Sequence, residues 1–488
     1  MNLLHEFLDT AAERAPARPA VRHGAALLTY GSLAAHSERL AAWLVSLGVR
    51  RRDRVVVALR LDVMVPAVVY ACSRVGGVFV VLNADTPRVV AAHVLDDAEP
   101  ALVLTDSPTL SELAAERGIP CHSMDAVRTA DTDRRQFDGP VPVDPVCFVY
   151  TSGSTAMPKA VVCTHQQVTF TAQAIQAQLD YQANDVVYCV LPLSFDYGLY
   201  QIFLATLAGA AVHLATGGGH RLAVELGDTD ATILPAVPSL AANLARLLAR
   251  RLSRIPRLRL LTNTGAAMPV DLLGQLRERL PSLTVQLMYG LTECKRATIM
   301  PKDEDLRRPG ACGRALPGTE VLVVDATGTP LPTGEIGEVL VRGPNVMAGY
   351  WRCPELTEQR FPRADGLFPQ LRTGDHGWLD DDGYLYFAGR HDDLYKEHGF
   401  RVSAIEVEAA AYRIPDVRAA VVLPPAGARE GATLLVQTTL TADEVLRAMR
   451  DHLDVVKIPA RCVVVPEIPL SANGKVARAE LAGLMGEG

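Results

Sequence analysis

Residues 146–163 read Val-Cys-Phe-Val-Tyr-Thr-Ser-Gly-Ser-Thr-Ala-Met-Pro-Lys-Ala-Val-Val-Cys, in which apolar strands at 146–150 and 160–163 flank a polar segment. The segment 151–159 is made of small residues that carry hydroxyl and free N–H groups, and it ends at Lys159. Such a loop can surround phosphate oxygens with donors and one positive charge. It lacks the second glycine of a Walker loop and the helix directly after the lysine. The stretch therefore predicts a phosphate-binding loop, with a polar hairpin loop as the alternative.

Helices and strands alternate on both sides of this segment. Apolar residues recur at helical spacing near 3–12 and 33–47. The order then continues as strand 54–59, helix 65–75, strand 78–82, helix 88–95 and strand 101–105, and after the loop as strand 186–191, helix 199–207, strand 211–214 and strand 231–234. Alternation of this kind implies right-handed crossovers and parallel sheets covered by helices on both faces. We expect an α/β protein with two such layers.

The pattern changes in the last third of the chain. Glycine-punctuated strands at 320–325, 337–342 and 383–388 indicate a small β-rich subdomain. Beyond residue 390 the pattern predicts short helices and strands, at 404–412, 419–423, 433–438, 442–453 and 461–465. We therefore predict a large N-terminal domain over 1–390 and a small, mobile α+β lid over 391–488.

Composition excludes several classes of protein. The chain has 488 residues, a formal net charge of −7 and nine cysteines without a C-x-x-C pair, which favours reduced thiols in a cytoplasmic protein. A net negative charge gives no general attraction to nucleic acid or to anionic lipid. The start of the chain is too acidic for a signal peptide. Two apolar stretches, 63–82 and 186–215, contain Arg74 and Asp196, so we expect core elements and not membrane spans.

Further motifs follow the loop. They are Pro192-Leu193-Ser194-Phe195-Asp196, Asn263-Thr264-Gly265-Ala266-Ala267, Tyr289-Gly290-Leu291-Thr292-Glu293, Gly334-Glu335-Ile336-Gly337-Glu338, Thr373-Gly374-Asp375, Gly389-Arg390 with Asp392, and Asn473-Gly474-Lys475. In this order they resemble the motifs of the adenylate-forming superfamily, which contains acyl-CoA synthetases, nonribosomal peptide adenylation domains and firefly luciferase. The resemblance spans most of the chain. It implies activation of a carboxylic acid by ATP as an acyl-adenylate.

The resemblance assigns an ATP site. Tyr289 offers an aromatic face for adenine, Asp375 can accept both ribose hydroxyls with Arg390 nearby, and Glu293 is an oxygen ligand suited to Mg²⁺ on the ATP phosphates. Lys159 is expected to act with them in catalysis. The other expected ATP-binding residues are Thr151, Ser152, Gly153, Ser154, Thr155, Gly265, Ala266, Gly290 and Thr292.

The resemblance also assigns catalytic and hinge residues to the lid. In the family, the lysine that matches Lys475 neutralises the charge that develops between the substrate carboxylate and the α-phosphate. Asp392 matches the hinge about which the lid rotates. This sequence departs from the family where Ala156 and Ala160 replace loop glycines and where His398 stands at a common arginine position. The loop substitutions put loop mobility in doubt, and His398 puts thiol transfer in doubt.

Asp196 matches the aspartate that binds the substrate ammonium in peptide-synthetase adenylation domains. A structural salt bridge or a helix-cap role is the alternative. The resemblance places the following residues around the side-chain pocket: Tyr197, Tyr200, Ala236, Thr262, Thr264, Met288, Arg296 and Ala297. Bulky residues among them favour a small substrate, while Arg296 could meet a second carboxylate or form an internal ion pair. A small amino acid, including a β-amino or an acidic one, is expected.

The sequence looks most like stand-alone aminoacyl-carrier-protein ligases of polyketide and macrolactam pathways. We therefore expect transfer to the phosphopantetheine thiol of a separate carrier protein. Carrier proteins are acidic, and a basic cluster could bind one or could be a solvated helix end: Arg250, Arg251, Arg254, Arg257 and Arg259. The main alternative is an acyl-CoA synthetase that uses free coenzyme A and an acid without an amino group. A non-catalytic binding protein is disfavoured, since it has no use for the lid lysine.

Overall fold

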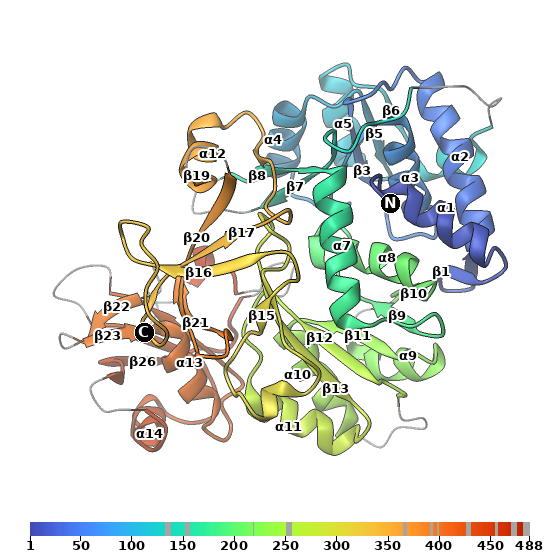
Figure 1. Cartoon of the computed structure of the whole chain (residues 1–488). Coiled ribbons are helices and arrows are strands. Elements are labelled where there is room, and N and C mark those ends of the chain that lie inside the picture. The colour runs from blue at the N-terminus through green and yellow to red at the C-terminus, as the bar shows by residue number, and fades with distance from the viewer. Residues whose placement is uncertain are drawn as a thin grey trace.

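The computed structural model describes most of the chain (Figure 1). The described residues are 1–131, 138–151, 157–217, 219–249, 256–364, 368–390, 394–397, 400–425, 431–453, 457–469 and 476–481. Two large sheets with helices on both faces form the first two thirds of the chain, and β-rich and α+β parts follow. The prediction of an α/β fold is confirmed.

The first large sheet has seven strands in the order β18-β8-β7-β4-β3-β5-β6. Its strands are β3 (Arg54–Ala58), β4 (Val78–Val81), β5 (Leu102–Thr105), β6 (Cys121–His122), β7 (Pro145–Thr151), β8 (Lys159–Thr164) and β18 (Gly349–Tyr350). Strands β3 to β7 pair in parallel, whereas β8 runs antiparallel to β7. The last residue of β7, Thr151, therefore pairs with the first residue of β8, Lys159.

The second large sheet has nine strands in the order β15-β14-β13-β12-β11-β9-β10-β1-β2. Its strands are β1 (Pro19–His23), β2 (Ala26–Thr29), β9 (Val186–Cys189), β10 (Ala211–Leu214), β11 (Ile233–Ala236), β12 (Leu260–Asn263), β13 (Thr284–Tyr289), β14 (Thr298–Ile299) and β15 (Arg314–Ala315). The central pairs are parallel. The edge hairpin β1–β2 was not predicted, because its strands are short and its turn is no stronger a signal than many others in the chain.

Helices pack between and outside the two sheets. Between them lies one apolar core that includes buried residues of α1 (His5–Arg14), α2 (Tyr30–Ser46), α3 (Met64–Val75), α7 (His165–Leu179) and α8 (Asp196–Ala208). Helix α7, which the sequence pattern did not reveal, stands at the centre of Figure 1. Helix α6 (Met124–Thr129) packs on the same core, whereas separate apolar clusters hold α4 (Arg88–Ala98), α5 (Pro108–Glu116), α9 (Leu222–Asp228), α10 (Pro238–Leu248) and α11 (Val270–Arg279).

The two apolar stretches are core elements, as predicted. Residues 63–82 form α3 and β4, and 186–215 form β9, α8 and β10. Over the described ranges, no helix has the length and apolar character that a membrane crossing requires.

The β-rich part forms a third sheet, which contains β16 (Glu320–Val324), β17 (Gly337–Arg342), β19 (Arg363–Ala364), β20 (Phe368–Leu379) and β21 (Leu385–Arg390). Helix α12 (Pro354–Arg360) and the segment 343–351 lie between β17 and β20 in the chain. This sheet packs its own apolar cluster against Tyr289 and Cys294 at the end of β13. The third sheet therefore lies beside the carboxyl end of the second.

The residues after 390 form two further sheets of their own, coloured orange to red in Figure 1. Their elements are β22 (Leu394–Glu397), β23 (Phe400–Ser403), α13 (Ala404–Tyr412), β24 (Ala419–Leu423), β25 (Thr433–Gln437), α14 (Ala442–Ala448), β26 (Arg461–Val464) and α15 (Arg478–Leu481). A separate apolar cluster fills this part. The sequence pattern predicted α13, β24, β25, α14 and β26 closely but not β22, β23 or α15, while the domain boundary at 390 and the mobility of the lid stay predictions.

Candidate active site

The predicted substrate pocket gathers at the carboxyl ends of β9, β11, β12 and β13, the position at which open α/β sheets bind ligands. Asp196 begins α8 and is only 4% exposed. Its Oδ2 lies 3.8 Å from Nζ of Lys295, a lysine that is 1% exposed. A buried carboxylate is costly without a partner, and here the protein supplies a lysine. The ion-pair alternative for Asp196 is therefore present in the structure, with Lys295 as the partner.

This pair is incomplete. An ammonium group has three donors, yet Nζ of Lys295 has no hydrogen-bond partner within the described parts of the chain. Burial disfavours its charged form, but Cys163 and Asp196 favour it more, so the pKa of Lys295 lies above its ordinary value. The lysine thus stays positively charged, with Asp196 and the Cys163 thiol as its polar neighbours.

Other polar atoms beside this pair also lack partners. They are Oγ1 of Thr264, Nε of Arg296 and the hydroxyl of Tyr200, as judged against the residues that the structure describes. Buried polar atoms are normally hydrogen-bonded, and those that are not mark strain or a place for a bound molecule. The Arg296 guanidinium carbon lies 4.8 Å from the ring centre of Tyr197, and Nζ of Lys295 lies 5.9 Å from that of Tyr200. Two cations, one carboxylate and two aromatic rings are therefore buried neighbours of one another.

The remaining predicted pocket residues have mainly packing roles in this state. The hydroxyls of Tyr197 and Thr262 are 2.7 Å apart. Met288, Ala297 and Ala236 are buried, and they line the strand ends with Thr264. The structure brings the predicted set together, and contact of these residues with a substrate stays a prediction.

The expected nucleoside residues lie at the end of β13 and within β20 of the neighbouring sheet. The hydroxyl of Tyr289 donates to Oδ2 of Asp375 over 2.7 Å, and both residues are buried. Burial and this carboxylate raise the pKa of Tyr289 well above its ordinary value, so the phenol stays protonated. Asp375 is paired in register with Arg390 across β20 and β21. The aromatic ring, the carboxylate and the arginine expected around a nucleoside are thus placed together.

Glu293 is held from two directions. Its carboxylate Oε1 accepts from the hydroxyl of Tyr350 over 2.7 Å, and its carbonyl accepts from the N–H of Met347 over 2.9 Å. In the described ranges no cluster of three or more His, Cys, Asp or Glu could hold a metal ion. A single half-buried carboxylate fits Mg²⁺ all the same, because protein-bound Mg²⁺ is commonly held by one or two carboxylates, water and substrate phosphates.

The loop flanks are in place. Thr151 pairs with Lys159 where β7 meets β8, and both residues are half-buried. Gly265 has a φ of 88° and is exposed together with Ala266 at the end of β12. Gly290 and Thr292 are half-buried between Tyr289 and Glu293. Several predicted residues lie outside the described residues, namely Ser152, Gly153, Ser154, Thr155, Asp392 and Lys475, and so does the side chain of Arg390.

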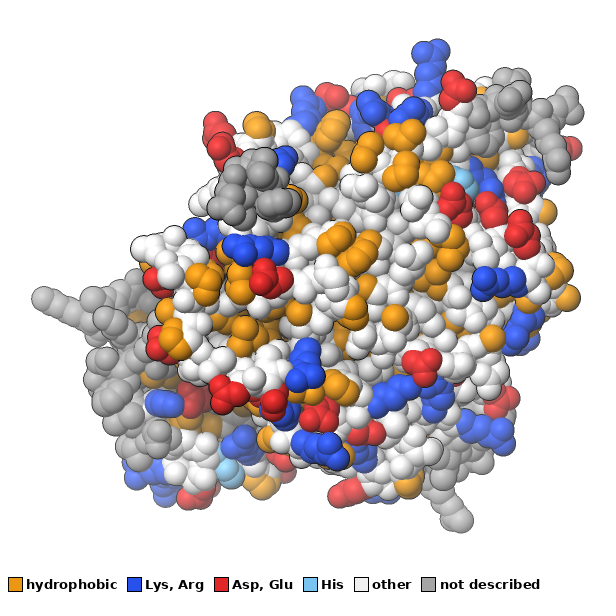
Figure 2. Space-filling view, in the orientation of Figure 1, with side chains coloured by type: hydrophobic (Ala, Val, Ile, Leu, Met, Phe, Trp, Pro, Cys, Tyr) orange, Lys and Arg blue, Asp and Glu red, His pale blue; other side chains and the backbone are white. Residues whose placement is uncertain are grey.

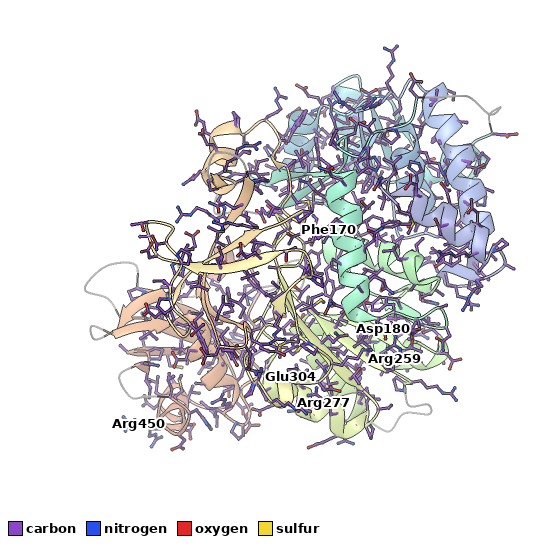
Figure 3. The ribbon with its side chains drawn as sticks, viewed as in Figure 1. Phe170, Asp180, Arg259, Arg277, Glu304 and Arg450 are labelled. Atoms are coloured by element: carbon purple, nitrogen blue, oxygen red, sulfur yellow. The ribbon has the colours of Figure 1, made fainter. Side chains whose placement is uncertain are left out.

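One part of the predicted basic cluster belongs to the fold. Nε of Arg259 donates to Oδ1 of the buried Asp185 over 2.7 Å, and its Nη2 donates to the carbonyl of Asp180 over 3.1 Å (Figure 3). Arg259 is therefore held by Asp185 and Asp180, while 32% of its side chain stays exposed, and a docking role for it stays a prediction. Arg257 is exposed, and Arg250, Arg251 and Arg254 lie outside the described residues. On the face drawn in Figure 2, basic and acidic side chains are interspersed.

Sequence reasoning missed Lys295. A lysine is normally a surface residue, so the residue type gave no sign that this one is buried in the pocket beside Arg296. Only the tertiary contact with Asp196 reveals it.

The family is decided by comparison with known sequences. The family described as AMP-binding enzyme matches residues 8–351, and the AMP-binding enzyme C-terminal domain matches residues 406–475. The chain belongs to the AMP-binding enzymes. It is thus an adenylate-forming ligase of the acid–thiol class, as the sequence motifs predicted.

Curated relatives of this AMP-binding enzyme use different acceptors. A feruloyl-CoA synthase of Amycolatopsis sp. is 31% identical over 488 residues, with 96% of each chain covered. An L-proline--[L-prolyl-carrier protein] ligase of Streptomyces coelicolor is 31% identical over 506 residues, which cover 96% of this chain and 93% of the relative.

Solved structures agree on the fold. VinN in complex with L-aspartate is 39% identical, with a TM-score of 0.73 over 79% of this chain and 98% of VinN. ATP-bound MatB from Rhodopseudomonas palustris is 27% identical, with a TM-score of 0.87 over 99% of both chains.

Proposed function

We propose that this AMP-binding enzyme activates a small amino acid that carries a second carboxylate, and that it passes the aminoacyl group to the phosphopantetheine thiol of a separate carrier protein. The observation that carries the proposal is the buried pair of Asp196 and Lys295, surrounded by polar atoms without partners. An aspartate-like acid, in the α- or β-amino arrangement, would supply an ammonium group for Asp196 and a carboxylate for Lys295.

The charges of the pocket match such a substrate. The ammonium of an amino acid would bind Asp196, and the free donors of Lys295 and Arg296 would bind the carboxylate that does not react. An acid of similar size that lacks the ammonium group and the second carboxylate would leave Asp196, Lys295 and Arg296 without partners. The pocket should therefore bind such an acid weakly. Arg296 is suited to this role because its Nε is free while its Nη1 donates to the carbonyl of Lys295 over 2.6 Å.

In the first half-reaction the reacting carboxylate attacks the α-phosphorus of ATP. A carboxylate oxygen–phosphorus bond forms, and pyrophosphate leaves. Asp375 and Tyr289 would hold the nucleoside, Lys159 and the loop before it the phosphates, and Lys475 would balance the developing charge. Mg²⁺ held by Glu293 would neutralise charge on the phosphates.

In the second half-reaction the carrier thiol attacks the acyl carbon of the adenylate. A carbon–sulfur bond forms, the thiol proton is lost and AMP leaves. Support for the substrate comes from the L-aspartate complex of VinN, and support for the acceptor comes from the L-prolyl-carrier protein ligase.

The test is amino-acid-dependent exchange of radioactive pyrophosphate into ATP across a panel of L-aspartate, other dicarboxylic amino acids, β-alanine, alanine and succinate. We expect the highest kcat/KM with an amino acid that has two carboxylates. A preference for succinate or for any acid without an amino group would overturn the substrate assignment.

The second candidate is an acyl-CoA synthetase, which the feruloyl-CoA synthase relative favours. The activated acid should be offered to a phosphopantetheinylated carrier protein and to free coenzyme A at equal concentration. Faster thioester formation with coenzyme A would favour this candidate over the carrier-protein ligase.

A further inference from the structure

The two pocket cations stand on a strained turn. Lys295 has a φ of 60°, which is uncommon for a residue with a Cβ atom, and the N–H of Arg296 donates to the carbonyl of Cys294 over 2.7 Å. A hydrogen bond between residues two apart around a positive φ is a tight γ-type turn, a rare and strained form. Such a conformation persists only where the surroundings hold it.

Asn345 holds this turn at both ends. Its side-chain Nδ2 donates to the carbonyl of Arg296 over 2.9 Å and lies 3.5 Å from the carbonyl of Cys294. Asn345 is 0% exposed, so no water competes for these carbonyls. One amide group thus links the residues before and after Lys295.

The turn also packs against Gly290. A Cβ atom at Gly290 would lie 2.3 Å from the carbonyl oxygen of Lys295 and 2.8 Å from Cα of Arg296. The turn therefore packs directly on the backbone of the Tyr289-Gly290 motif, and Asn345 bonds to the carbonyl that follows it.

The segment that carries Asn345, residues 343–351, is itself fixed. The N–H of Ala348 donates to the carbonyl of Val162 over 3.0 Å, and Nε2 of Gln167 donates to the carbonyl of Val346 over 2.8 Å. The N–H of Met347 donates to Glu293. The segment of Asn345 is thus attached to β8 of the first sheet and to helix α7. Asn345 itself contacts a turn that follows β13 of the second sheet.

We propose that Asn345 is a positioning residue for substrate selection, which sets the place of Lys295 and Arg296 in the pocket without touching the substrate. The inference rests on the proposed function for the identity of the group that these cations bind. Glu293 is held by Met347 and Tyr350, and Tyr289 is held by Asp375, so none of these contacts on the ATP side uses the Asn345 amide.

The test compares Asn345→Asp, which exchanges the donor for an acceptor at constant shape, with the matched control Gln286→Glu. Gln286 is also buried, and its Nε2 donates to two carbonyls away from the turn, those of Gln178 and Met300, at 3.1 and 3.0 Å. The readouts are KM for the best acid of the exchange panel, KM for ATP, and the ratio of kcat/KM for L-aspartate to that for β-alanine or alanine.

For Asn345→Asp we expect KM for the acid to rise at least tenfold, KM for ATP to stay within threefold, and the aspartate preference to fall at least tenfold. Gln286→Glu should keep the wild-type preference within twofold. Equal losses for acid and ATP, or an unchanged preference, would show a merely structural role and overturn the inference. If Asn345→Asp does not fold, Asn345→Ala removes the donors without burying a charge and is judged by the same values.

A wild-type enzyme that prefers an acid without a second carboxylate would refute the proposed function. The KM comparison on that acid would still decide the role of Asn345.

Discussion

Replacement of Lys295 by methionine tests most directly whether its positive charge selects an acid with a second carboxylate. Lys295→Met keeps the length of an unbranched apolar chain and removes the ammonium that faces Asp196 at 3.8 Å. Loss of one partner of a buried charge pair at a binding site costs about 2–5 kcal/mol. Because both residues are at most 5% exposed and the contact is longer than a hydrogen bond, we expect about 3 kcal/mol.

That free energy corresponds to a loss of ~150-fold in kcat/KM for an acid with a second carboxylate. For β-alanine or alanine, which have no such carboxylate, the loss should be less than about tenfold, since their ammonium still meets Asp196. The assay is pyrophosphate exchange with each acid at saturating ATP. Lys295→Arg is the control that keeps the charge.

The same change should lower the stability of the free enzyme, since it leaves Asp196 buried without its lysine. We expect a loss of about 3 kcal/mol in the free energy of unfolding for Lys295→Met, and recovery of at least half of it in the double variant Asp196→Asn with Lys295→Met. Stability should recover in the double variant, but activity with dicarboxylic amino acids should not. The reasoning is refuted if Lys295→Met keeps the wild-type preference among acids within threefold.

Three further predictions concern other groups. Asp375→Asn should raise KM for ATP by at least about tenfold, because an amide replaces the charged acceptor beside Tyr289. KM for the acid should change little. An unchanged KM for ATP would contradict the role of Asp375 in binding the ribose. Lys475→Ala should abolish adenylate formation yet keep the melting temperature, and near-normal pyrophosphate exchange would exclude its catalytic role. Burial opposes ionisation of Asp144, but Arg51, the N–H of Val141 and Arg52 lower its pKa from 3.8 to about 2. Its stabilisation is therefore complete above about pH 5 and is lost as pH falls through about 2. Asp144→Asn should therefore cost ~2 kcal/mol at pH 5 and clearly less at pH 2.5 in urea unfolding, and an equal cost at both values would contradict this assignment.

Much of the fold follows from local pattern. The apolar strand 146–150 and the helix–strand alternation around it are set by side-chain periodicity, and parallel sheets with helical cover follow from that order. The short edge hairpin β1–β2 and helix α7 escaped prediction, because neither shows a strong period of its own. The motifs from Thr151 to Asp375 identified the chemistry, since each combines suitable residue types at short spacing.

The sequence by itself thus determined the α/β class, the adenylate-forming chemistry and most residues around the site, because these depend on residue types at short spacings. Tertiary structure alone decided which charges meet. Lys295 faces Asp196 although 98 residues lie between them in the chain. Asn345 reaches the turn at Lys295 from another sheet. It also decided that Arg259 pairs with the buried Asp185. Long-range contacts of this kind depend on how sheets pack, and no local periodicity encodes them.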